Sequence, residues 1–331
     1  MKLAAVTMVR NEMDIIGAFL RHLDALFDYA LVMDHHSIDG TDRVLADACA
    51  NRPGWTMWHL EPVGYHQTLF SSFALRHMMS NTDADIVVFL DADEFIDVAG
   101  RAPLERACET LSDADRVGLL FWRNTVPERL DARAIQPGEP IWRAPALASF
   151  GKVVIQRPFF IRHGHEAQLT IGNHGLFYNP ELVVPFDCVG EILHLPVRSH
   201  TQIKGKVVAG VFSTMAQAAR LAVQNRHWFD ILYRIADGTL RDDDLIGIAV
   251  HYGQTDSVRL PVSRTELVTA GYTLAPLEVA FGRGFESAAE PSWVDPVRLI
   301  ASILRAYQVE DARNSELVLQ GNRLCIVPKG A

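Results

Sequence analysis

Short apolar runs alternate with stretches of helical periodicity along the first 120 residues. The apolar runs have the length of buried strands, which predicts strands at residues 3–8, 29–33, 55–60, 86–90 and 117–122. Between them, apolar positions at helical spacing predict helices at residues 11–26, 41–50, 67–79 and 103–111. Strands that alternate with helices indicate right-handed βαβ units, and therefore an α/β fold with a mostly parallel central sheet.

The pattern changes in the second half of the chain. Residues 124–150 are rich in Pro and Arg and are expected to form a long loop, and further strands are predicted at 152–156 and 191–195. From residue 200 onward one helical period follows another. We therefore expect an α/β domain over residues 1–200 and a mostly helical extension over residues 201–331.

Composition and charge narrow the class of protein. Hydrophobic residues make up 49% and charged residues 21%, as in an ordinary globular protein. The formal net charge is −9, which argues against a nucleic-acid partner. The four cysteines form no C-x-x-C pair, and no stretch has the length and apolarity of a signal peptide or a spanning helix. These features favour a cytoplasmic protein, with peripheral membrane contact left open.

Two carboxylates stand where the most apolar strand ends. Asp91 and Asp93 follow the apolar run at 86–90 directly, and ligands of such sheets bind beyond the carboxyl ends of the strands. Two carboxylates one residue apart can hold a hard divalent cation such as Mn²⁺ or Mg²⁺, which can bridge them to a diphosphate. The competing interpretation of this D-x-D is a solvated acidic turn.

A second strand end carries another carboxylate. Asp34 follows the strand at 29–33 and can accept a hydrogen bond from a nucleotide base or a ribose hydroxyl. Asp39 and Thr41, a few residues later, are typical of a turn followed by a helix start. Asn11 is expected to cap the first helix in the same way.

Three segments together resemble the family-2 glycosyltransferases, whose single-domain nucleotide-sugar fold is called GT-A. A fourth, downstream segment is similar to a block of one bacterial branch of that family, and the resemblance covers roughly residues 3 to 255. The segments are V-T-x-x-R-N-E at residues 6–12, V-x-D-x-x-S-x-D-G-T at 32–41, F-L-D-x-D-E-F at 89–95 and H-x-P-x-R-S-x-x-Q-x-x-x-K at 194–206.

The resemblance implies a GT-A catalytic domain over residues 1–200 that takes a nucleotide-sugar donor and a glycan or lipid-linked acceptor. It implies metal ligands at Asp91, Asp93 and His194. An Arg fork suits a phosphate and a Lys supplies a point charge, so the late basic residues are expected near the diphosphate. The residues implied in donor binding are Thr7, Arg10, Asn11, Glu12, Asp34, Asp91, Arg198 and Lys206.

The chain departs from the family at two places. His35 and His36 follow Asp34 where small or amide residues are common. The acidic pair that usually supplies the general base is not evident. The candidates for this base are Glu166, Glu191 and His174, with Asp187 in the same interval.

Three functions compete at this stage. The leading one is metal-dependent sugar transfer, with inversion at the anomeric carbon as the family usually performs it. A non-catalytic carbohydrate-binding protein that retains the fold is the second. A phosphotransferase whose first D-x-D aspartate is the nucleophile is the third, and Phe95 stands where such enzymes commonly have Thr or Val.

Overall fold

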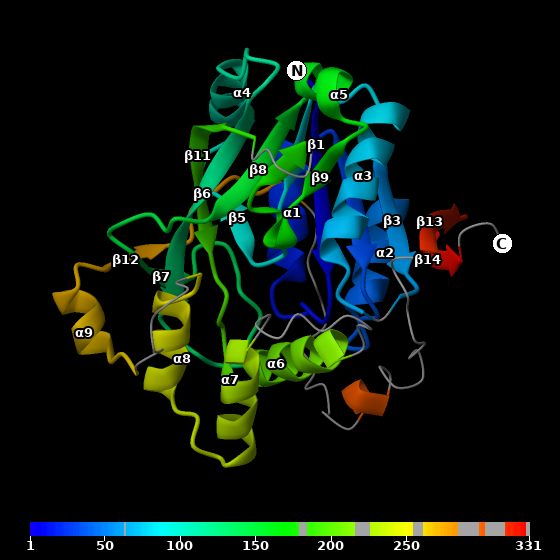
Figure 1. Cartoon of the computed structure of the whole chain (residues 1–331). Coiled ribbons are helices and arrows are strands. Elements are labelled where there is room, and N and C mark those ends of the chain that lie inside the picture. Colours follow the sequence, from blue (N-terminus) through cyan, green and yellow to red (C-terminus); the bar gives the residue numbers. More distant parts are fainter. Residues whose placement is uncertain are drawn as a thin grey trace.

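The computed structural model shows one large sheet with helices on both of its faces (Figure 1). It describes residues 1–62, 64–178, 184–215, 226–253, 261–283, 298–301 and 315–328. The α/β class predicted from the sequence is confirmed.

Four parallel strands form the middle of the sheet, in the order β4-β1-β2-β3. The parallel arrangement confirms the βαβ prediction for this part of the chain. All four strands therefore end at the same edge, where the first three motif segments lie. The strands are β1 (Leu3–Val9), β2 (Tyr29–Asp34), β3 (Trp55–Leu60) and β4 (Ile86–Phe89).

The strands beyond β4 pair in both directions. β8 (Gly151–Gln156) runs antiparallel between β4 and β6 (Val117–Pro127), and β7 (Pro140–Arg143) runs antiparallel to β6. The expected long loop at 124–150 is therefore wrong in part, because β6 extends to Pro127 and β7 occupies residues 140–143. β11 (Phe186–His194) runs parallel to β6 and antiparallel to β5 (Glu94–Ile96), which brings its last residue opposite Glu94.

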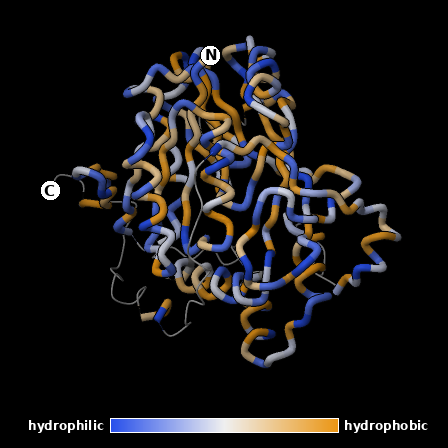
Figure 2. The backbone as a smooth tube through the Cα atoms, turned by 180° about the vertical axis from the view of Figure 1, so that it is seen from behind, coloured by the Kyte–Doolittle hydropathy of each residue, from blue (hydrophilic) through white to orange (hydrophobic). Residues whose placement is uncertain are grey.

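Helices cover both faces because alternate strand residues point to opposite sides of the sheet. One apolar core lies under α1 (Ile16–Leu26), α2 (Thr41–Ala50) and α4 (Arg101–Glu109). The other lies under α3 (Gln67–Asn81) and α5 (Arg157–His163), beside the hairpin of β9 (Ala167–Leu169) and β10 (Leu176–Tyr178). Figure 2 shows hydrophobic residues concentrated along the central strands.

The part after residue 200 contributes both helices and strands. Its helices are α6 (His200–Met215), α7 (Arg226–Ala236), α8 (Asp242–Val250) and α9 (Arg264–Thr269). Its strands are β12 (Thr273–Pro276), β13 (Ser315–Gln320) and β14 (Arg323–Pro328). The expectation that the sheet ends near residue 200 is wrong, because β12 pairs with β7 and β14 with β3, covering edges whose backbone groups would otherwise lack partners. No helix in the described part is long and apolar enough to cross a membrane.

Candidate functional site

Asp93 lies in the short turn between β4 and β5 and is buried. Its Oδ2 is 2.6 Å from Lys206 Nζ and 3.7 Å from Arg198 Nη1. Burial raises the pKa of a carboxyl group, but the positive charges of Lys206 and Arg198 outweigh it, so the pKa of Asp93 is lowered. Asp93 is therefore an ionised carboxylate within a buried network.

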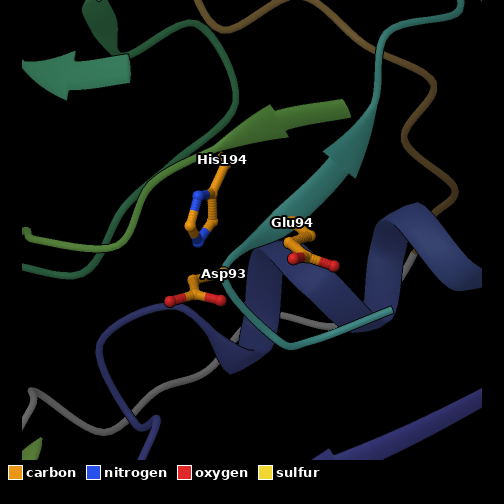
Figure 3. A group of neighbouring side chains, drawn as sticks. All are labelled: Asp93, Glu94 and His194. Carbon is orange, nitrogen blue, oxygen red and sulfur yellow. The ribbon is translucent and has the colours of Figure 1, made fainter. Parts of the chain in front are cut away.

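His194 ends β11 and points its ring toward Asp93 (Figure 3). Its Nδ1 is 3.3 Å from Asn124 Oδ1, and its ring stacks on Trp122 at a centroid distance of 4.2 Å. Because an amide oxygen only accepts, Nδ1 carries the proton and Nε2 the lone pair. Burial lowers the pKa of His194 to about 3, so the imidazole is neutral, which is the form that binds metals.

Ligand atoms of Asp93, Glu94 and His194 lie within 4.8 Å of one another. A carboxylate and an imidazole nitrogen fit a divalent cation such as Mn²⁺. Glu94 has structural partners, because it accepts hydrogen bonds from the Asp91 backbone N at 2.9 Å and from Trp122 Nε1 at 2.7 Å. Burial raises its pKa to about 8. Asp93 and His194 are therefore the two residues best suited to hold a cation.

Asp91 lies outside that group of three. Its Oδ2 is 2.6 Å from Lys152 Nζ, and its side chain is 32% exposed. Lys152 is fully buried near the start of β8 and also lies 3.4 Å from Glu94 Oε1. Sequence reasoning missed Lys152, because a single lysine at the start of a predicted strand is typical of a solvated position.

Hydrogen bonds join the loops after β1 and β2. Asn11 has a left-handed backbone (φ 54°) and lies before α1, which begins only at Ile16. Asn11 therefore does not cap α1, and that expectation is wrong. The expected turn before a helix is confirmed at Asp39 and Thr41, because Asp39 Oδ1 accepts a hydrogen bond from Thr41 N at 2.9 Å and α2 begins at Thr41. The side chains of Asn11, Asp39 and Thr41 also accept hydrogen bonds from the backbone of the opposite loop. The bonds run from Asn11 N to Ser37 Oγ (3.0 Å), Ile38 N to Asn11 Oδ1 (2.8 Å), Glu12 N to Thr41 Oγ1 (3.0 Å) and Met13 N to Asp39 Oδ2 (3.1 Å).

Arg10 offers two unpaired donors beside these loops. Its Nη1 donates to Ser213 Oγ of α6 at 2.6 Å, whereas Nε and Nη2 are buried without a hydrogen-bond partner among the described residues. Nε–H and Nη2–H form one edge of the guanidinium, which can bind two oxygens of a phosphate at once. Thr7 Oγ1 and Asn11 Nδ2 are likewise buried and unpaired. Buried donors without partners are costly, so this cluster fits a ligand that brings oxygen atoms.

Asp34 ends β2, and its carboxylate is buried. Its Oδ1 accepts a hydrogen bond from Ser37 N at 3.3 Å, and its Oδ2 is 3.8 Å from His59 Nδ1. Burial raises its pKa, and its charge in turn raises that of Arg10, which burial lowers to about 10. The neighbouring His35 and His36 hold the segment after β3, with ring nitrogens 3.0 Å from the carbonyls of Pro62 and Glu61.

Arg198 holds the segment after β1 in place. Its guanidinium forms a bidentate pair with Asp14 at 2.7 and 2.9 Å, contacts Glu12, and donates to the Leu195 carbonyl at 3.1 Å. Burial raises the pKa of Glu12 to about 7 despite this contact. Arg198 thus lies beside Asp93 in the D-x-D turn, but its N–H groups are bonded within the protein.

The three candidates for the general base lie in different places. Glu191 Oε2 is bonded to Arg123 at 2.7 and 2.9 Å, and Glu166 is exposed in the turn after α5. His174 lies beside the buried group, with its ring 4.7 Å from Trp122 and its Nδ1 donating to the Gly151 carbonyl at 2.7 Å. Burial, with Lys152 nearby, lowers its pKa to about 3, so its Nε2 is an unprotonated but weak base.

No model of a known protein family matches the chain, and no curated protein matches it in sequence. Among solved structures, the chain is similar to TarS 1–349 of S. aureus in complex with UDP, at 13% identity, covering 100% of this chain and 97% of that one, with a TM-score of 0.38.

Two further structures are similar to smaller extents. S. aureus TarS matches at 12% identity over 82% of this chain and 49% of that one, with a TM-score of 0.36, so the chain spans about half of that protein's length. Glucosyl-3-phosphoglycerate synthase from Mycobacterium tuberculosis, in complex with Mn²⁺, UDP and glucosyl-3-phosphoglycerate, matches at 19% identity over 37% and 44%, with a TM-score of 0.24. At such low similarity, function has to be inferred from this chain's own residues.

Proposed function

We propose that this chain is a metal-dependent glycosyltransferase of the family-2 type with a GT-A domain. It moves a sugar from a nucleoside diphosphate to a hydroxyl group of a glycan, a lipid-linked sugar or another acceptor, with inversion of the anomeric carbon. The observation that carries this proposal is a pair of Arg10 donors that have no partner in the described part of the chain. They lie close to Asp34, at the sheet edge that also holds Asp93 and His194.

The side chains at this edge match the parts of such a donor. The Asp34 carboxylate suits a ribose hydroxyl or a base N–H, and the Arg10 edge suits phosphate oxygens. Lys206, which is paired with Asp93, adds a partly buried positive charge at this edge. The donor would therefore lie across the ends of β2, β1 and β4.

Asp93 and His194 would hold a divalent cation, which would supply positive charge to the leaving diphosphate. One carboxylate oxygen of Asp91, the first aspartate of the D-x-D, forms an ion pair with Lys152, and the side chain is partly exposed. This exposure suits contact with a ribose or with the cation. Of the three proposed bases, His174 is the one beside this group, and its Nε2 lone pair could accept the proton of an acceptor hydroxyl.

A thermal-shift screen of UDP-, GDP- and dTDP-sugars, each with Mn²⁺, Mg²⁺ or EDTA, tests the proposal. A ligand that binds the native state raises stability by RT ln(1 + [L]/Kd), about 2.7 kcal/mol at a hundredfold excess over Kd. We expect one nucleotide to stand out with metal and to lose its effect with EDTA. No shift with any of the three nucleotides would contradict the proposal.

A non-catalytic carbohydrate-binding protein is the alternative, and one observation favours it. Glu191 is bonded to Arg123 and Glu166 is exposed in a turn, so neither carboxylate lies with the buried group. Release of nucleoside diphosphate from the donor selected in the screen separates the two. Turnover, even with water as acceptor, supports the enzyme, and binding without turnover supports the alternative.

A further inference from the structure

Lys152 is a buried cation that the donor site described above leaves without a role. It stands near the start of β8, where the antiparallel register with β4 (Val88 opposite Val154) brings it level with the start of the D-x-D turn. No solvent reaches its side chain. Burial of a charged lysine is unfavourable without compensation, so its partners determine whether it stays charged.

The partners of its ammonium group come from two different parts of the chain. Nζ donates to Asp91 Oδ2 at 2.6 Å and to the Gly172 carbonyl at 2.8 Å, and it lies 3.4 Å from Glu94 Oε1. Burial alone would lower its pKa, but Asp91 and Glu94 outweigh it and raise the pKa, so the charge is kept. One group thus contacts both the D-x-D turn and the loop that contains Gly172.

Contacts from other parts of the chain hold the loop at residues 170–175. Gly172 (φ 75°) and Asn173 (φ 56°) are both left-handed, a conformation that glycine adopts freely and asparagine more readily than most residues. Two contacts hold Gly172 from opposite sides. Lys152 binds its carbonyl, and its N–H donates to Gln67 Oε1 at 2.7 Å, which also accepts from Tyr65 at 2.8 Å.

The same loop positions His174. A Cβ atom at residue 172 would lie 2.2 Å from His174 Nε2, so the ring packs directly against Gly172. The other sides of the ring meet Trp122 and Phe150, at centroid distances of 4.7 and 5.0 Å. The position of Gly172 therefore sets the position of the His174 ring.

We propose that Lys152 is a positioning residue that couples the donor side of the site, through Asp91, to the loop at 170–175 that carries His174. The inference rests on the proposed function, because it takes Asp91 as part of the donor site. The ammonium group of Lys152 holds both Asp91 and the loop at 170–175. A change in the position of the loop therefore changes donor binding through this group.

Three variants test the coupling. Lys152→Met removes the charge and keeps most of the chain length. Gly172→Ala moves the loop by strain and by collision with His174, without touching Asp91. Gly238→Ala is the matched control, because Gly238 is also left-handed (φ 66°) but has open space around it, in the turn after α7. Thermal unfolding establishes that each variant is folded.

The probe is the tightest binder among UDP, GDP and dTDP with Mn²⁺, and the readouts are its Kd and hydrogen exchange of residues 170–175. In the parent and Gly238→Ala, the probe should slow exchange in this loop. In Lys152→Met and Gly172→Ala, we expect Kd to rise at least fivefold and the slowing to disappear. If Gly172→Ala has the same Kd and the same slowing of loop exchange as Gly238→Ala, the coupling is overturned. If Lys152→Met does not fold, the comparison of Gly172→Ala with Gly238→Ala alone tests the proposal.

Failure of the proposed function has a different signature. If the parent binds none of the three nucleoside diphosphates, the donor assignment is wrong. The support of the loop is then tested without ligand, where Lys152→Met should exchange at least tenfold faster at residues 170–175 than Gly238→Ala. Equal exchange in these two ligand-free proteins would refute the support by Lys152 itself.

Discussion

Lys206 Nζ on α6 lies 2.6 Å from Asp93 Oδ2 in the turn after β4, which joins two residues 113 positions apart in the chain. With His194 beside the same carboxylate, this places a buried negative charge between a fixed cation and a neutral imidazole. The negative charge of Asp93 repels a diphosphate unless further positive charge, such as a bound divalent cation, lies beside it. Removing the charge of Asp93 is therefore the most informative test of the site.

Asp93→Asn keeps the size of the side chain and removes its charge. If Asp93 holds the cation, Mn²⁺-dependent binding of the donor should be lost and kcat should fall at least about 100-fold, the scale of one well-placed charge-stabilising group. Turnover and calorimetry with and without Mn²⁺ measure both. Asp115→Asn is the control, because Asp115 is an exposed carboxylate that forms an ion pair with Arg162. Full activity of Asp93→Asn, or of the parent in excess EDTA, would contradict the metal-dependent mechanism.

Asp34→Ala tests the nucleotide end of the site. Loss of a contact made equally in the ground state and the transition state raises KM and leaves kcat nearly unchanged. We expect donor KM to rise about tenfold, consistent with one lost hydrogen bond to a charged group. Asp47→Ala, exposed on α2, should behave like the parent. An unchanged KM in Asp34→Ala would exclude it from the donor site.

Arg198→Met tests whether Arg198 supports the fold. The substitution leaves the buried Asp14 carboxylate and the nearby Glu12 without their partner, and breaking a buried ion pair costs about 3–5 kcal/mol. Urea unfolding should show this loss. Arg116→Met, which breaks the exposed pair with Asp187, should cost less than about 1 kcal/mol. Similar losses in both variants would mean that the buried pair contributes no more than a surface pair.

His22 should make the fold sensitive to mild acid. It is fully buried, with Nδ1 donating to the Ala280 carbonyl at 2.9 Å and Nε2 accepting from Ile96 N at 2.9 Å, and burial lowers its pKa to about 4. Because the folded pKa lies below the unfolded value of 6.5, the unfolded chain binds the proton first. The stabilisation is therefore fully present above pH 6.5 and is lost progressively as the pH falls from 6.5 through 4.

The measurement compares the parent with His22→Gln, which keeps a donor and an acceptor but does not titrate in this range. Between pH 7 and pH 5, the parent should lose about 2 kcal/mol more unfolding free energy than the variant. The comparison isolates His22 because the other buried histidines are common to both proteins. Parallel pH profiles would show that His22 is not the titrating group.

The sequence by itself determined the parallel core of the sheet and the edge at which the site lies. Apolar runs at 3–8, 29–33, 55–60 and 86–90 correspond to β1, β2, β3 and β4, because a buried strand requires nearly every residue to be apolar. Parallel strands end at one edge, so the positions of Asp34, Asp91 and Asp93 in the sequence were enough to bring them to the same side.

Only the tertiary structure decided which charges are paired and which are available. Arg10 and Arg198 are both arginines in motif segments. Arg198 is bonded to Glu12 and Asp14, whereas two donors of Arg10 find no partner among the residues that the structure describes. Lys152 lies in none of the motif segments, and the register of β8 on β4 brings it beside the D-x-D turn. Pairings between residues tens to hundreds of positions apart depend on packing geometry, which local patterns do not encode. The pairing of β12 with β7 and of β14 with β3 depends on that geometry equally.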